Sequence, residues 1–239
     1  MKRIGKYSNA VIVISEYLKI HLLNIVRDKV PVYYLPINVS NFADNESNEN
    51  IKEPIIKMFY GGSFGEKDGI IYLLKAFEEV AKKHENVELI LTGKPPKAGM
   101  SSIIEYIKHS PFNHKINYLG YIDDITFYKK MGSCDILCMT RINSNYANAG
   151  FPFKLGEMLA TGKPVIATNI SDISKFLIDK KNAIIVKPES INDLVNGINY
   201  IIDNPSKSKE IGTNGKVVAL NNFNSDILTS ELKLFFNTL

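Results

Sequence analysis

The chain has 239 residues, of which 45% are apolar and 23% charged, and its formal net charge is +4. This composition is sufficient for a sizeable hydrophobic core and favours a folded chain over a disordered one. The lysines are spread along the sequence and form no arginine-rich blocks, which argues against a nucleic-acid-binding protein.

Cysteine usage and the polar first residues point to a cytoplasmic protein. Cys134 and Cys138 lie four residues apart in a predicted strand, without the spacing or histidine partners of a zinc site. We interpret both as buried, reduced thiols, and we expect no metal. No signal peptide precedes the first apolar run, and no apolar run has the length of a membrane span. At most, the protein would associate peripherally with a membrane.

The first apolar run, residues 10–14, is rich in β-branched residues and predicts a buried strand. Ser15 is a suitable N-cap for a helix that runs to about Asp28, and a second short run follows at residues 32–35. A buried strand this early in the chain lacks sheet neighbours. Residues 41–54 are mostly polar and predict a linker between an N-terminal part, residues 1–40, and a larger domain, residues 55–239.

From residue 55, apolar strands alternate with amphipathic helices. Ile70, Leu74 and Phe77 illustrate the helical spacing between the first two strands. Buried strands separated by helices predict an α/β fold with a doubly wound, parallel, Rossmann-like sheet. The predicted strands are residues 55–60, 87–92, 116–119, 135–139, 164–167 and 183–186.

Two loops are expected to meet at the ligand-binding edge of this sheet. In a sheet of order 3-2-1-4-5-6, the crevice lies outside the carboxyl ends of strands 1 and 4, where the winding reverses. Here those ends open the loops that begin at Gly61 and at Thr140. Both loops contain glycine, so chain order and local composition indicate the same place.

The stretch from Gly150 to Thr168 predicts a short helix followed by a buried strand. Pro152 suits the first helical position, Gly162 suits the residue after the end, and Pro164 prevents continuation. We expect about three helical turns. The N–H groups and dipole at the helix start attract an anion, most simply a phosphate, and Lys154 in the first turn is unfavourable unless an anion is bound.

The candidate binding residues allow more than one interpretation. Glu157 lies beyond the first helical turn and could accept hydrogen bonds from two ribose hydroxyls, or could be an ordinary surface glutamate. Lys67 could meet a phosphate or remain a solvated side chain. Tyr121 and Ile122 follow the third strand, where Tyr121 could border a base or anchor the loop. Gly61 and Gly62 allow close backbone approach but do not fit Gly-x-Gly-x-x-Gly, which disfavours a nicotinamide-dependent oxidoreductase.

Residues 151–168 resemble the donor-site signature of retaining GT-B glycosyltransferases of the family 4 type. Other segments agree with that family in order, including residues 60–77, 89–93, 118–122 and 182–188. Residues 10–15 and 32–36 resemble the last strand of its N-terminal domain and the crossing into the second domain. The resemblance implies the C-terminal half of a GT-B fold, with a remnant of the N-terminal domain before residue 40.

The family implies a role for each matching residue. Glu157 would hold the ribose, Lys67 would meet the diphosphate, and Gly150, Phe151, Phe153 and Lys154 would present the helix start to the phosphates or sugar. Two positions depart from the family pattern. The first glutamate of its paired motif falls on Ala149, and the arginine after the first strand's glycine falls on Gly62.

The implied function is transfer of a sugar, with retention, from a UDP- or GDP-type nucleotide-diphospho-sugar without a cofactor. The acceptor-binding domain of such enzymes would have to come from a separate domain or chain. A non-catalytic nucleotide- or sugar-binding partner subunit is the alternative, favoured by Ala149 and Gly62. An epimerase that acts on nucleotide sugars uses the same bilobal fold and is a further alternative.

Overall fold

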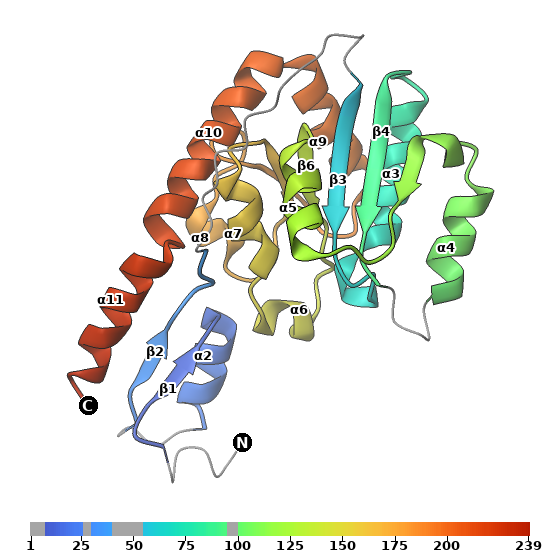
Figure 1. Cartoon of the computed structure of the whole chain (residues 1–239). Helices are drawn as coiled ribbons and strands as arrows, with labels where there is room; N and C mark the ends of the chain where they lie inside the picture. Colours follow the sequence, from blue (N-terminus) through green and yellow to red (C-terminus); the bar gives the residue numbers. More distant parts are fainter. Residues whose placement is uncertain (1–7, 26–29, 40–54, 95–99) are drawn as a thin grey trace.

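The computed structural model describes residues 8–25, 30–39, 55–94 and 100–239. Within these ranges the chain forms a two-stranded sheet near the N-terminus and a six-stranded sheet in the larger unit (Figure 1). The predicted linker, residues 41–54, lies outside the described residues. The domain boundaries proposed from the sequence therefore stay a prediction.

The six-stranded sheet is parallel and has the strand order β5-β4-β3-β6-β7-β8. Counted from the first strand of this unit, that order is 3-2-1-4-5-6, which confirms the predicted doubly wound sheet. Each predicted strand agrees with the structure to within one residue at both ends. The strands are β3 Ile56–Gly61, β4 Val87–Thr92, β5 Ile116–Tyr118, β6 Ile136–Met139, β7 Val165–Thr168 and β8 Ile184–Val186.

Helices cover both faces of this sheet, and each face has its own core. One core joins the sheet to α3 Ile70–Ala81, α4 Met100–His109 and α9 Ile191–Asp203. The opposite core joins it to α5 Asp124–Gly132, α6 Asn145–Ala149, α7 Phe153–Ala160 and α8 Ile173–Phe176. The long helix α10, Pro205–Asn222, contributes to both cores. Short 3-10 turns, η1 Glu66–Asp68 and η2 Asn113–Lys115, precede α3 and β5.

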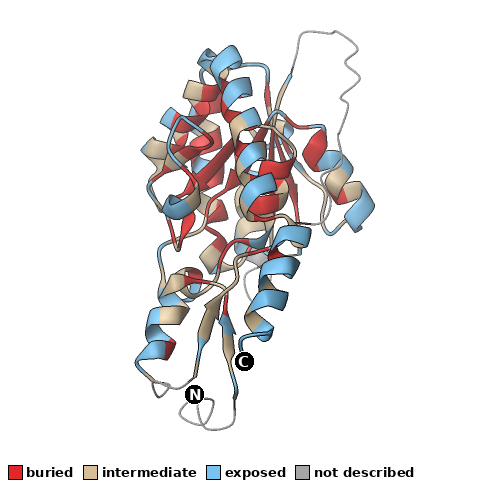
Figure 2. Cartoon of the chain, turned by 90° about the vertical axis from the view of Figure 1, so that its left-hand side faces the viewer, coloured by how far each residue is buried: buried red, intermediate tan, exposed pale blue. Residues whose placement is uncertain are grey.

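Successive side chains of a strand point to opposite faces of the sheet. Because helices cover both faces, neighbouring side chains are buried in different cores. Met58 and Phe59 are neighbours on β3, yet Met58 packs under α3 and Phe59 packs under α5 and α7. A parallel sheet with both faces covered has this continuous apolar character. Figure 2 shows the buried residues gathered in this sheet and the helices beside it.

The N-terminal unit consists of β1 Val11–Val13, α2 Glu16–Leu23 and β2 Val32–Tyr34. Ser15 caps α2 as predicted, since its hydroxyl accepts a hydrogen bond of 3.2 Å from Leu18 N. The helix ends at Leu23, earlier than the predicted Asp28, and residues 26–29 lie outside the described ranges. β1 and β2 pair in parallel and bury only a small cluster around Val13 and Leu22.

The last helix, α11 Ser225–Phe236, returns to the N-terminal unit (Figures 1 and 2). The ring of Phe235 stacks on Tyr33 of β2 with 4.6 Å between centroids. Val39 N donates to Phe223 O at 2.6 Å, and Ser225 N donates to Val39 O at 3.2 Å. Helix α11 therefore packs against the N-terminal unit, although the two are far apart in the sequence. No helix in the described ranges is both long and apolar enough to span a membrane.

Both cysteines are buried, and Cys134 lies just before β6 rather than within the strand as expected. Burial raises the pKa of each thiol to about 12. The thiolate is the reactive form, so at pH 8 only roughly one thiol in ten thousand is ionised in the folded protein.

We therefore expect both thiols of the folded protein to resist a disulfide reagent such as DTNB at pH 8 over many minutes. In 6 M guanidinium chloride, about two thiols per chain should react within seconds, because unfolding returns the pKa to about 8.5. The absorbance of released thionitrobenzoate measures both. Fast reaction of the folded protein would show that at least one thiol is accessible.

Candidate functional site

The loops after β3 and β6 meet at the carboxyl edge of the sheet, as the strand order predicts. Ile142 N donates a hydrogen bond of 3.0 Å to Lys67 O, and the Thr140 hydroxyl donates one of 3.1 Å to Asp68 O. The two strands are neighbours in the sheet, and these bonds join the loops that follow them. As a result, Lys67 and Arg141, two cationic residues, are held next to each other.

A cavity of 160 Å³ lies between these two loops and the start of α7. Its walls come from the end of β3, the end of β6, the two loops and both turns of α7. The lining residues are Tyr60, Gly61, Gly62, Ser63, Lys67, Asp68, Cys138, Met139, Thr140, Arg141, Pro152, Phe153, Lys154 and Met158.

The side chains that line the cavity carry more positive than negative charge. Lys67, Arg141 and Lys154 contribute three cationic groups, and Asp68 is the one carboxylate among the lining residues. Asp68 already accepts hydrogen bonds within its own loop, from the Ser63 hydroxyl at 2.5 Å and from Gly65 N at 3.0 Å. Asp68 ends η1, and the N-cap residue of α3 is Gly69. The cavity is therefore electropositive and suits an anion.

Lys154 is partly buried, and no carboxylate of the described residues lies at ion-pair distance from it. Its Nζ lies 3.7 Å from the centroid of the Phe127 ring. Burial lowers the pKa of Lys154, and the more distant carboxylates of Glu157 and Asp124 oppose that shift. A desolvated cation of this kind gains stability when an anion binds beside it. The fold therefore places Lys154 in the first turn of α7, where the sequence predicts that a lysine is unfavourable unless an anion is bound.

The start of α7 carries no side-chain cap. Pro152 is the N-cap residue and the helix begins at Phe153, so the prediction of Pro152 at the first helical position was wrong by one residue. The helix has eight residues, about two turns rather than the expected three. Gly162, with φ of 73°, follows its end as predicted. An uncapped helix start faces the electropositive cavity, which adds backbone donors to the site.

Glu157 lies on α7 one turn after Phe153 and next to Met158, which both line the cavity, but it is not a lining residue itself. The hydroxyl of Tyr128 on α5 donates a hydrogen bond of 2.8 Å to Glu157 Oε1. Burial and this carboxylate raise the pKa of Tyr128 to about 12, so the phenol remains a donor. Oε2 of Glu157 has no hydrogen-bond partner among the residues that the structure describes. One carboxylate oxygen is therefore fixed and the other is available.

The remaining predicted site residues divide into two groups. Gly61, Gly62 and Phe153 line the cavity together with Lys67 and Lys154. A Cβ atom at Gly61 would overlap the ring of Phe127, and one at Gly62 would overlap the hydroxyl of Tyr60. Both positions therefore require glycine because of close packing.

Besides Glu157, four predicted site residues do not line this cavity. The side chain of Phe151 is 2% exposed and packs against Phe176 and Phe223, so only its backbone can face a ligand. Gly150 ends α6 in extended conformation. Tyr121 is 75% exposed beyond β5, and Ile122 packs against the core below α5. Any nucleotide contacts of Tyr121 and Ile122 stay a prediction.

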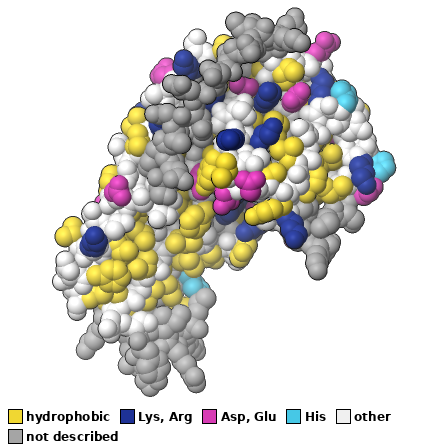
Figure 3. Space-filling view, viewed as in Figure 1, with side chains coloured by type: hydrophobic (Ala, Val, Ile, Leu, Met, Phe, Trp, Pro, Cys, Tyr) yellow, Lys and Arg dark blue, Asp and Glu magenta, His cyan; other side chains and the backbone are white. Residues whose placement is uncertain are grey.

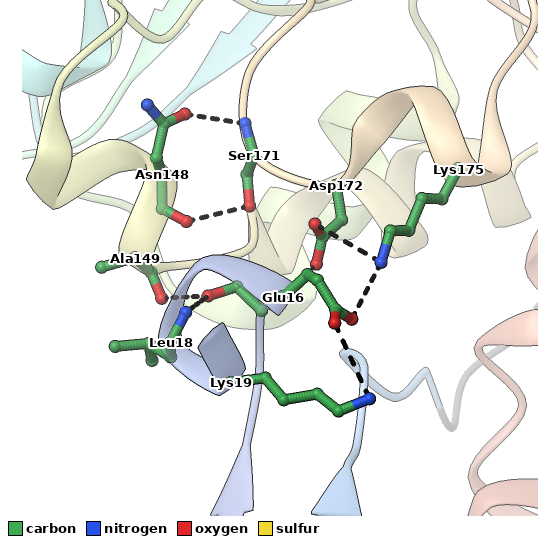
Figure 4. A network of polar contacts seen from close by, with 9 residues as sticks. Glu16, Leu18, Lys19, Asn148, Ala149, Ser171, Asp172 and Lys175 are labelled. Carbon is green, nitrogen blue, oxygen red and sulfur yellow. Dashed lines mark hydrogen bonds and ion pairs between the residues drawn. The ribbon is translucent and has the colours of Figure 1, made fainter. Parts of the chain in front are cut away.

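The N-terminal unit reaches the back of the α6–α7 loop (Figure 4). The buried hydroxyl of Ser15 donates to Ala149 O at 2.8 Å, and Glu16 N donates to Asp172 Oδ2 at 2.7 Å. From the other side, Ser171 N donates to Asn148 Oδ1 at 2.8 Å. The carboxyl end of α6 is thus held between the two units, directly before the start of α7.

Sequence reasoning missed Arg141 and Tyr128. Arg141 directly follows Thr140 at the end of β6, and the sequence has no other arginine after residue 27. Its position at the predicted crevice was the signal that could have identified it. Tyr128 lies 29 residues from Glu157, and no sequence pattern indicated their hydrogen bond. In the described part of the chain, no group of three or more His, Cys, Asp or Glu side chains could hold a metal ion.

Known proteins similar to this chain are glycosyltransferases. An uncharacterized glycosyltransferase of Methanocaldococcus jannaschii is 26% identical over all of this chain and 60% of its own length. The capsular polysaccharide biosynthesis glycosyltransferase CapM of Staphylococcus aureus is 23% identical over all of this chain and 64% of its own length. The chain thus spans about three fifths of these relatives.

The fold is that of a GT-B glycosyltransferase. The crystal structure of Anabaena Alr3699/HepE in complex with UDP superposes with a TM-score of 0.83 at 17% identity, covering 99% of this chain and 65% of that one. The same protein in complex with UDP-glucose gives a TM-score of 0.82. The family model for glycosyl transferases group 1 matches residues 41–218, about three quarters of the sequence. The chain therefore belongs to the glycosyl transferases group 1 family.

Proposed function

We propose that this chain is the donor-binding part of a retaining glycosyltransferase of the family 4 type and that it binds a nucleotide-diphospho-sugar. The observation that carries the proposal is the cavity between β3, β6 and α7. Three cationic side chains meet there, and the only carboxylate among its lining residues is occupied by hydrogen bonds within its own loop. A diphosphate supplies the charge that this arrangement lacks.

The position of Glu157 suggests where the nucleoside would lie. It adjoins Met158, which lines the cavity, and it has one oxygen held by Tyr128 and one without a described partner. A ribose hydroxyl adjoining the diphosphate would be within the reach of that free oxygen. HepE, a protein with the same fold, has been crystallised with UDP and with UDP-glucose, which supports a UDP-type donor here.

In the proposed reaction, the bond between the anomeric carbon and the diphosphate oxygen breaks. Negative charge develops on the departing nucleoside diphosphate, where Lys67 and the uncapped start of α7 would stabilise it. An acceptor hydroxyl forms the new bond on the face that the diphosphate leaves and gives its proton to the departing diphosphate oxygen, so the configuration is retained. Groups already fixed by the fold need little reorganisation during this step.

The acceptor would be bound by a further domain or chain next to the N-terminal unit. That unit has only two strands and a small core, and sheets of this size are marginal alone. Apolar side chains gather over this unit and over α11 (Figure 3). Ile20 and Leu23 on α2 and Leu234 on α11 are exposed. We also propose a cytoplasmic location, because both cysteines are free and suit a reducing compartment.

Calorimetric titration of the purified chain with UDP, GDP and ADP tests the proposal. We expect binding of at least one nucleotide, and a loss of about 10- to 100-fold in affinity in Glu157→Ala, since hydrogen bonds to a charged group are worth about 1.5 to 3 kcal/mol. Glu79→Ala, which removes an exposed carboxylate on α3, is the control and should bind normally. Absence of binding to all three nucleotides, or normal binding by Glu157→Ala, would contradict the proposal.

A non-catalytic binding subunit is the second candidate, and Ala149 is the observation that favours it. The family's first glutamate would stand there, and the alanine side chain offers no hydrogen bond to a sugar. Mixing the chain with the acceptor-binding domain of a relative and radiolabelled nucleotide sugar would separate the two candidates. Sugar transfer that requires both components would exclude a purely binding role.

A further inference from the structure

Arg141 is the one arginine in the described part of the chain, and its backbone is held firmly at the end of β6. Its carbonyl oxygen accepts a hydrogen bond of 2.8 Å from the buried hydroxyl of Thr168 on β7. The next residue, Ile142, donates its N–H to Lys67 O at 3.0 Å. These two bonds fix where the arginine side chain leaves the sheet, beside Lys67 and at the rim of the cavity.

The guanidinium of Arg141 is the cation of this cavity that is least engaged by the protein. Lys67 Nζ lies 4.9 Å from the ring centroid of Tyr146, and Lys154 Nζ lies 3.7 Å from that of Phe127. Among the described residues, the Arg141 side chain has no hydrogen bond, no ion pair and no aromatic ring beneath it, and its charge acts on the buried Tyr60 hydroxyl. Five N–H donors are therefore left for a ligand.

The guanidinium extends across the cavity toward the start of α7. A Cβ atom built on Gly150 would lie 3.9 Å from Arg141 Nη1, so the side chain reaches the α6–α7 loop. On the β3 side, Tyr60 is buried and its hydroxyl occupies the space of any side chain at Gly62. A side chain at position 62 would displace that hydroxyl, and the β3 loop supplies no arginine to the cavity. The arginine comes from the end of β6 instead.

We propose that Arg141 is the residue that recognises the diphosphate of the donor, through paired hydrogen bonds from its planar guanidinium. This inference rests on the proposed function and adds a residue and a chemical preference to it. A guanidinium matches two oxygens of a phosphate group, whereas a lysine ammonium acts as a point charge. Placed between Lys67 and the start of α7, Arg141 would distinguish a nucleoside diphosphate from the monophosphate.

The structure also explains why this arginine would be costly without a ligand. A backbone hydrogen bond between Ile142 and Lys67 brings the β6 and β3 loops together, so that the cationic side chains of Lys67 and Arg141 line one cavity, and its one carboxylate, Asp68, already accepts hydrogen bonds within its own loop. Repulsion between such groups destabilises the empty site, and an anion relieves it. A residue that served only the fold would instead stabilise the unliganded protein.

Affinities for UDP and UMP, measured by calorimetry or by competition, test the proposal with Arg141→Gln and Arg141→Lys. Arg141→Gln should weaken UDP binding at least tenfold and UMP binding less than threefold. Arg141→Lys should lie between wild type and Arg141→Gln for UDP, because it keeps the charge and loses the planar fork. Lys209→Gln, on the exposed side of α10, is the charge-matched control and should leave both affinities unchanged.

Thermal unfolding without nucleotide supplies an independent readout. Arg141→Gln should have a midpoint equal to or higher than that of the wild type, since the repulsion from Lys67 is removed. A lower midpoint, equal losses for UDP and UMP, or unchanged UDP binding would each overturn the role of Arg141. If the wild-type chain binds no nucleotide, both this inference and the proposed function fail. If it binds UDP and Arg141→Gln binds UDP equally well, only this inference fails.

Discussion

Replacing Gly69 with alanine is expected to lower the free energy of unfolding by about 2 to 4 kcal/mol and to weaken nucleotide binding. Gly69 has φ of 61°, a conformation that costs other residues about 1 to 2 kcal/mol. Its Cβ atom would also overlap the carbonyl oxygen of Thr140, a backbone atom. Relief of that overlap would separate the loops that carry Lys67 and Arg141.

Denaturant unfolding followed by circular dichroism measures the stability change, and titration with UDP measures the effect on binding. Gly65→Ala is the matched control in the same loop. Gly65 has φ of −71°, and its nearest neighbour, Asp68 Oδ2, would lie 3.5 Å from the new Cβ atom. It should change stability by less than about 0.5 kcal/mol. Equal effects at the two glycines would show that the β3 and β6 loops are not in contact as described.

Phe223→Ala is expected to destabilise the protein by about 3 to 5 kcal/mol. Phe223 lies in the sequence between α10 and α11, and its side chain is fully buried. Its ring centroid lies 5.0 Å from that of Phe176 and 5.8 Å from that of Phe151. Removing it leaves a cavity among rings that the surroundings can only partly fill. Because Phe151 anchors the start of α7 in this cluster, we also expect the helix start to become more mobile.

Urea unfolding monitored by tyrosine fluorescence is suitable for this series, since the chain contains 12 tyrosines and no tryptophan. Phe223→Leu should cost less than about 1.5 kcal/mol, because it keeps most of the buried volume. Phe236→Ala, at a ring that is 53% exposed, should cost less than about 1 kcal/mol. A similar loss in Phe236→Ala and Phe223→Ala would contradict the burial of the aromatic cluster.

The sheet and the location of its ligand crevice could be predicted from the sequence, because both depend on local and repeated signals. Each buried strand is a short apolar run bounded by turn residues, as at Val87–Thr92, where both predicted ends are correct. The handedness rule for parallel connections then leaves few strand orders. The meeting of the loops after Gly61 and Met139 follows from that order alone.

Long-range contacts could not be predicted, because they leave no trace in local periodicity. The pattern around Phe151 suggested a residue at a binding loop, whereas Phe176 and Phe223, distant in sequence, draw its ring into the core. The hydrogen bond that orients Glu157 depends on Tyr128 of a different helix. The early end of α2 at Leu23 likewise contradicts the apolar pattern that continues beyond it.

The stacking of Phe235 on Tyr33 has a consequence for the synthesis of the protein. About 200 residues separate the two rings, and a ribosome that adds about 5 to 20 residues per second needs roughly 10 to 40 s to make that stretch. During this interval, β2 lacks the helix that later covers it, and its apolar side chains remain exposed. The N-terminal unit is thus the first part of the described chain to be translated and the last to be completed.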